Sequence, residues 1–179
     1  MKDSGPQWCS SFPGSNQVNA MVPAFAAKVT AFLDALHKAG ALVTISATYR
    51  PPERAWLMHY AYEIAHKKIA PGAVPVHDGI DINWLHLTNG KPDLAASILA
   101  AKQMVAAYGI RHEPVLISRH TEGRAIDMTI DWKGKLKITD AGGVVHTCAT
   151  QEDLWPVGES YGVMKLKQGD PPHWSDDGH

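Results

Sequence analysis

The segment SRHTEGRAIDMTI (residues 118–130) decides the fold, because a strand pattern begins in it directly after a short turn. Its residues alternate between two faces: Ile126, Met128 and Ile130 lie on one, and Ala125, Asp127 and Thr129 lie on the other. A period of two is typical of a strand with one apolar side. We therefore expect the apolar side to enter a core and Asp127 to project from the opposite side.

The turn before this strand offers a second functional group. Gly123 permits the positive φ that would bend the chain and bring His120 back toward Asp127. An imidazole and a carboxylate seven positions apart then form a candidate ligand pair. An ordinary loop followed by an edge strand, with both side chains in solvent, explains the same residues, and a short motif by itself is only a hypothesis.

The segment DPPHW (residues 170–174) supplies a second histidine near the C-terminus. Its two prolines fix φ and stiffen the connection between Asp170 and His173. Two imidazoles and one carboxylate are a usual ligand set of catalytic zinc, with a fourth position left for water. Asp170 is then placed to act as the base beside that water. The other interpretation of Asp170 is a turn-forming aspartate before proline.

Together these segments resemble the zinc D,D-peptidases and L-alanyl-D-glutamate peptidases that cut bacterial peptidoglycan. This group includes D-Ala-D-Ala carboxypeptidases, D-Ala-D-Ala dipeptidases and phage endolysins. The pattern Ser-x-His-x-x-Gly-x-Ala-x-Asp is matched at every fixed position, and acid-x-x-His-Trp follows it. The upstream segment SATYR (residues 46–50) is similar to the family's Ser-x-x-Tyr-Arg segment, so the resemblance spans residues 46–174 in the family's order.

The resemblance implies a role for each matched residue. His120, Asp127 and His173 would bind Zn²⁺, Asp170 would be the catalytic acid/base, and Arg50 would stabilise the oxyanion. Zinc lowers the pKa of bound water to about 7, and an arginine keeps its charge at any practical pH. Losing one electrophilic donor of this kind typically costs roughly 10²–10³ in turnover. The other interpretation of Arg50 is a surface residue at the end of a strand.

The remaining candidate site residues have weaker support from the matched motifs. The predicted substrate contacts are Tyr49, Ser118, Trp174 and Trp84. The family usually has glutamate where this chain has Asp170, which is shorter by one methylene group. The alternative candidates for the base are Glu159 and Asp176.

The resemblance implies a zinc metallopeptidase that hydrolyses an amide bond next to a D-amino acid in the peptidoglycan stem peptide. It would be either a bacteriolytic, endolysin-like L-Ala-D-Glu endopeptidase or a D,D-carboxypeptidase or D,D-endopeptidase. Two alternatives from other classes are a non-catalytic wall-binding module and a zinc-stabilised interaction domain with a degenerate site. The aspartate at the base position motivates the wall-binding module.

The rest of the chain predicts an α+β fold. Helical spacing covers 22–36, 53–68 and 93–108, and strand patterns cover 42–47, 114–118, 124–131 and 134–139. Lys133-Gly134 is typical of a hairpin turn. We expect a single compact domain, with N-terminal helices packed on a small, mainly antiparallel sheet that carries the metal site. Residues 1–20 are predicted to form an irregular arm, and residues 21–179 the zinc peptidase domain.

A long loop is predicted at residues 70–91. It contains five residues of chemical interest: His77, Asp78, Asp81, Trp84 and His86. One interpretation is a substrate-recognition flap with Trp84 as a stacking surface, and the other is a polar surface loop with one anchoring tryptophan. His77, Asp78 and Asp81 also form a rival candidate for the metal site.

Composition limits the partners and the location. With 17 Lys and Arg against 18 Asp and Glu, the net charge is −1, which gives no electrostatic case for nucleic acid or an anionic membrane. No apolar run reaches the ~20 residues of a membrane span, and the N-terminus lacks a signal-peptide pattern. We expect a protein made in the cytoplasm that acts on the wall in the periplasm or outside the cell, delivered through a holin or a secretion machine. Cys9 and Cys148 could be bridged or free.

Overall fold

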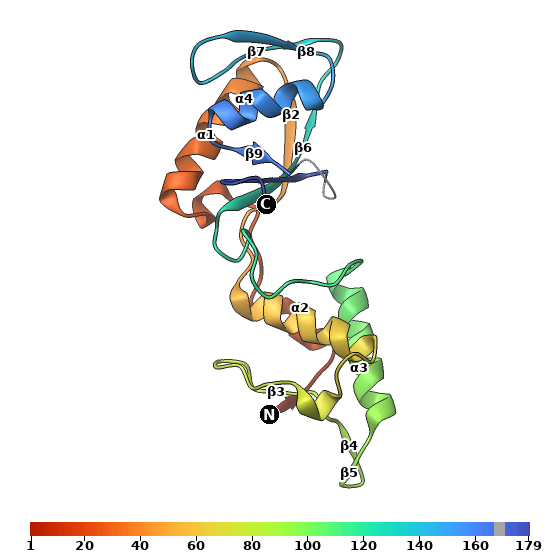
Figure 1. The fold of residues 1–179 in the computed structure, drawn as a ribbon. Helices are drawn as coiled ribbons and strands as arrows, with labels where there is room; N and C mark the ends of the chain where they lie inside the picture. Colours follow the sequence, from red (N-terminus) through yellow and green to blue (C-terminus); the bar gives the residue numbers. More distant parts are fainter. Residues whose placement is uncertain (167–170) are drawn as a thin grey trace. The chain divides into compact units, whose positions relative to one another are not determined.

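The alternating segment forms β6 (Ala125–Asp131), the strand that carries most of the predicted site. It is flanked on both sides by antiparallel strands, β2 (Leu42–Ala47) and β10 (His173–Ser175). The two-residue strand β9 (Met164–Lys165) pairs with β10, so the sheet order is β2-β6-β10-β9. This is a computed structural model, and it describes residues 1–166 and 171–179 (Figure 1).

The contacts within the chain divide it into two units, each built from two segments. The sheet unit comprises Gly14–Arg50 and Arg119–His179, and the helical unit comprises Met1–Pro13 and Pro51–Ser118. Residues 1–13 of the predicted arm belong to the helical unit, and residues 14–20 belong to the sheet unit. The strand pair β1 (Lys2–Asp3) and β3 (Ile82–Asn83) is parallel and attaches the N-terminal residues to the helical unit.

The sheet unit buries one face of its sheet under α1 (Pro23–Lys38) and α4 (Trp155–Ser160) (Figure 1). Burial is nearly complete for the side chains that meet there: Val29, Phe32 and Leu36 from α1, Ile126, Met128 and Ile130 from β6, and Val157 from α4. A separate antiparallel hairpin, β7 (Leu136–Thr139) and β8 (Val145–Cys148), packs its buried side chains into the same core.

The helical unit is built on α2 (Pro52–Ala65) and α3 (Leu94–Tyr108). Asp93 caps α3 by accepting the N–H of Ala96 at 2.9 Å, and Gly109 ends that helix with φ 67°. Its core consists of apolar side chains from both helices and from the segment that connects them: Trp56, Leu57, Ile64, Ile82, Trp84 and Met104. A short antiparallel pair, β4 (Leu87–Thr88) and β5 (Lys91–Pro92), lies just before α3.

The predicted α+β class and the mainly antiparallel sheet are confirmed, as are the helices and the strand at 42–47. Two local predictions are wrong. Residues 114–118 form no strand, because they pair with no neighbouring strand. The side chains of Val115 and Ile117 are accordingly 56% and 76% exposed. Gly134 makes a turn with φ 68°, but β7 after it pairs with β8 and not with β6, so the turn closes no hairpin.

Two sequence questions about the chain receive structural answers. Cys9 and Cys148 are both free thiols, and each lies in a different unit. Among the residues that the structure describes, no helix is both long enough and apolar enough to cross a membrane.

Candidate metal centre

Two of the three predicted ligands are brought together by strand register. In the antiparallel pairing of β10 with β6, His173 lies directly opposite Asp127. Opposed residues of an antiparallel pair project from the same face of the sheet. Their neighbours Trp174 and Ile126, also opposed, enter the core on the other face. The alternation predicted for this strand therefore places both ligands on the face opposite the core.

The third ligand, His120, comes from the turn that leads into β6. The N–H of Gly123 donates to the carbonyl of His120 at 3.3 Å, and Gly123 has φ 66°, as predicted from the sequence. The carbonyl of Gly123 accepts the N–H of Val22 at the start of α1, at 3.0 Å. A Cβ at this glycine would lie 3.2 Å from that same nitrogen. Both backbone angle and space therefore require glycine at this position.

The three ligand atoms form a nearly equilateral triangle. His120 Nε2 lies 3.0 Å from Asp127 Oδ1 and 3.2 Å from His173 Nδ1, and the third side is 3.1 Å. Ligands at ~2.0–2.1 Å from a tetrahedral ion lie about 3.3 Å from one another. The triangle therefore has the size of one face of such a coordination shell.

The other nitrogen of each imidazole faces a main-chain carbonyl. His120 Nδ1 lies 3.4 Å from the carbonyl oxygen of Thr48, and His173 Nε2 lies 3.1 Å from that of His179. A carbonyl only accepts, so a ring that donates its N–H there has its second nitrogen available to a cation beside Asp127. In that tautomer three lone-pair-bearing atoms face one another at about 3 Å, an arrangement that a cation stabilises. The group could hold a metal ion.

Burial and charge agree with this arrangement. His120 and His173 are 5% and 8% exposed. Burial acts to raise the pKa of Asp127, but hydrogen bonds and charge interactions with the two histidines outweigh it and hold the pKa well below its usual range. Asp127 is therefore an ionised carboxylate at neutral pH, the form that binds metal.

The predicted oxyanion residue lies beside the turn that carries His120. The main-chain N–H of Arg50 donates to the carbonyl of His120 at 3.1 Å. Tyr49 is held one residue earlier, where its carbonyl accepts the N–H of Ser15 at 2.9 Å. Both side chains are half-buried. The SATYR segment is thus attached to the metal-ligand turn through its backbone.

The other predicted site residues lie in different parts of the chain. Asp170 lies outside the described residues. Trp174 is 2% exposed and packs against Phe32, with ring centroids 5.6 Å apart. Trp84 is 5% exposed and lies in the core of the helical unit. Ser118 is the last residue of the same unit. The substrate contacts proposed for Trp174, Trp84 and Ser118 stay predictions.

The alternative bases and the rival metal site receive little support. Asp176 lies against two arginines, at 3.5 Å from Arg119 and 2.8 Å from Arg124, and Glu159 is exposed on α4. In the helical unit His77 Nδ1 lies 2.7 Å from the carbonyl of Asp78, and Asp81 pairs with the terminal amine at 3.0 Å. Within residues 1–166 and 171–179, only His120, Asp127 and His173 converge as three metal-binding groups.

Some functional atoms were missed by sequence reasoning. The carbonyls of Thr48 and His179 carry no sequence signal, because every residue has a carbonyl. The ion pair between Arg119 and Asp177 was also missed. The sequence offered a signal for it, because the two residues have opposite charges and each lies close in sequence to a candidate metal ligand.

A groove of about 600 Å³ adjoins the second half of β6 in the sheet unit. None of His120, Asp127 and His173 lines this groove, and its lining residues Met128 and Trp174 belong to the core face of the sheet. Its walls also include Trp155 and Lys165. The volume is in the usual range for a small-ligand site, roughly 300–1,000 Å³.

No protein-family model matches this chain, and no curated protein matches it in sequence. The assignment of the metal centre therefore depends on the geometry of its own residues.

Proposed function

We propose that this chain is a zinc-dependent peptidase that hydrolyses an amide bond next to a D-amino acid in the peptidoglycan stem peptide. One observation carries the proposal: two imidazole nitrogens and one carboxylate oxygen lie 3.0–3.2 Å apart in a buried group. The choice of substrate is supported by the resemblance of three ordered motifs to peptidoglycan peptidases.

The donor set favours zinc over the hard cations. Magnesium and calcium prefer all-oxygen shells, whereas two imidazoles with one carboxylate form a frequent set in catalytic zinc sites. When bound, the ion would supply Lewis-acid polarisation of the scissile carbonyl and water activated at neutral pH. Three protein ligands leave a position for that chemistry.

The chain's own residues would perform the remaining steps. Arg50 follows a segment anchored to the His120 turn, and its permanent charge would bind the oxygen on which negative charge develops. Asp170 would take the proton of the attacking water and return it to the leaving amine.

The proposal is tested by pairing metal analysis with digestion of purified peptidoglycan. The wild type is expected to carry one zinc per chain and to release muropeptide fragments. Mass spectrometry then separates loss of one terminal D-alanine from release of the whole stem peptide. His120→Ala should lose both metal and turnover, and His37→Ala, at an exposed histidine near the end of α1, should lose neither.

Two other results would replace the proposal by one of the alternatives. Binding to sacculi without turnover in the zinc-loaded wild type would indicate a wall-binding module. A lower melting temperature for His120→Ala with its function intact would indicate a zinc-stabilised interaction domain.

A further inference from the structure

We infer that Asp177 is a positioning residue for the metal centre, because it holds the main chain of His179 against the ligand His173. The inference rests on the proposed metal site. It assigns a role to a carboxylate in the C-terminal segment that follows β10.

Asp177 organises a tight turn at the end of the chain. Its Oδ1 accepts the N–H of His179 at 3.1 Å and the hydroxyl of Ser175 at 3.2 Å. Ser175 Oγ accepts the N–H groups of Gly178 and His179, at 2.8 and 3.0 Å. This turn places the His179 carbonyl 3.1 Å from Nε2 of His173.

The same carboxylate reaches the turn that carries the other histidine. Asp177 Oδ2 accepts a hydrogen bond from Nη2 of Arg119, and Nη1 of that arginine binds Glu122 at 2.7 Å. Arg119 directly precedes His120. Asp177 therefore connects the segments of both histidine ligands, one through His179 and the other through Arg119.

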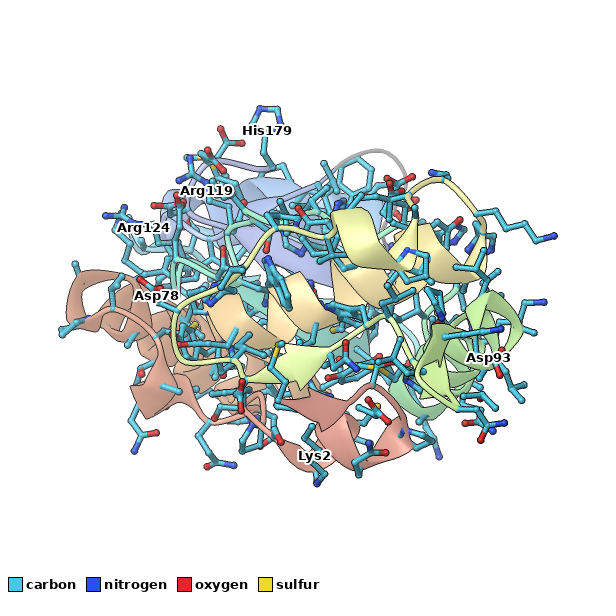
Figure 2. The ribbon with its side chains drawn as sticks, turned by 90° about the horizontal axis from the view of Figure 1, so that it is seen from below. Lys2, Asp78, Asp93, Arg119, Arg124 and His179 are labelled. Carbon is cyan, nitrogen blue, oxygen red and sulfur yellow. The ribbon has the colours of Figure 1, made fainter. Side chains whose placement is uncertain are left out.

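Figure 2 shows that the labelled residues Arg119, Arg124 and His179 lie on the same part of the molecule, with the ring of His179 turned outward. The main chain of His179, and not its exposed ring, thus faces the site. An acceptor at the second nitrogen of a ligand imidazole fixes its tautomer and raises its basicity, and losing such a partner typically weakens metal binding by 10–100-fold.

The experiment measures zinc affinity of the full chain by competition with a chromophoric chelator. Asp177→Ala is expected to weaken binding by roughly 10-fold or more. Asp177→Asn keeps an oxygen for the N–H of His179 and should recover part of the loss. Asp176→Asn is the matched control, because Asp176 pairs with Arg119 and Arg124 but its described contacts do not include His179. It should retain wild-type affinity.

Cobalt-loaded protein provides a readout that a merely structural role would not move. The visible absorption bands of Co²⁺ report ligand geometry, so Asp177→Ala should change them at saturating metal while Asp176→Asn should not. Unchanged affinity and spectra in both Asp177 variants would overturn the inference, as would an equal loss in Asp176→Asn. Failure of the wild type to bind zinc would overturn the proposed function as well, which separates the two failures.

Discussion

The sheet unit and the helical unit both contain histidines and aspartates in close sequence, yet among residues 1–166 and 171–179 only the set in the sheet unit converges. In the sheet unit, a turn, β6 and β10 each supply one side chain. Strand register places Asp127 opposite His173, and the turn before β6 brings His120 to them. In the helical unit, His77, Asp78 and Asp81 share one loop, where His77 contacts the carbonyl of Asp78 and Asp81 pairs with the terminal amine. Residues crowded in one loop satisfy each other locally, whereas a three-ligand site needs separate elements.

The largest expected difference between the units concerns metal binding. Asp127→Asn removes the charge of the group's only carboxylate, and we expect loss of zinc together with a fall in peptidase turnover of at least roughly 10³. The equivalent change Asp81→Asn in the helical unit should preserve both properties. Zinc stoichiometry after dialysis and rates on purified peptidoglycan measure this contrast. Equal losses in the two variants would remove the distinction between the units.

Trp84 tests whether the helical unit contributes a structural core or a substrate contact. The side chain is 5% exposed and lies against Trp56, with ring centroids 6.1 Å apart. We expect Trp84→Ala to lower the free energy of unfolding by about 3–5 kcal/mol through loss of packing. Denaturant titration measures this cost. A raised KM with unchanged stability would instead support the substrate contact predicted from the sequence.

Two glycines with similar backbone angles sharpen the comparison further. Gly123 in the sheet unit has φ 66° and a close neighbour, and Gly109 in the helical unit has φ 67° and open space around its Cβ position. The left-handed conformation costs alanine roughly 1–2 kcal/mol at either site. We expect Gly123→Ala to cost more than Gly109→Ala in thermal unfolding, and only Gly123→Ala to weaken zinc binding. Equal effects would mean that the close contact with Val22 is unimportant.

The smallest expected effect is a pH dependence of stability in the sheet unit. The hydrogen bond from Arg119 lowers the pKa of Asp177 from 3.8 to about 2. Because the folded-state pKa is below the ordinary value, ionised Asp177 stabilises the fold at pH above about 4, and this contribution disappears as the pH falls toward 2. The stability difference between wild type and Asp177→Asn should shrink over that interval. A difference that is constant with pH would contradict the assignment.

The sequence predicted much of the sheet unit because local rules and tertiary contacts agree there. The alternation of β6, the positive φ of Gly123 and the three candidate ligands all follow from residue type and spacing. The segment 114–118 was predicted as a strand from its apolar residues, but a strand also needs a partner, and sequence patterns do not show partners. The division into two units has no local sequence signal either, since each unit is assembled from two separated segments.

The central claim is tested most directly by X-ray absorption at the zinc edge of the zinc-loaded protein. The account predicts a first shell of nitrogen and oxygen at ~2.0–2.2 Å, with the outer-shell scattering of two imidazoles, reduced to one in His173→Ala. A sulfur neighbour at ~2.3 Å, or a spectrum that His173→Ala leaves unchanged, would contradict it.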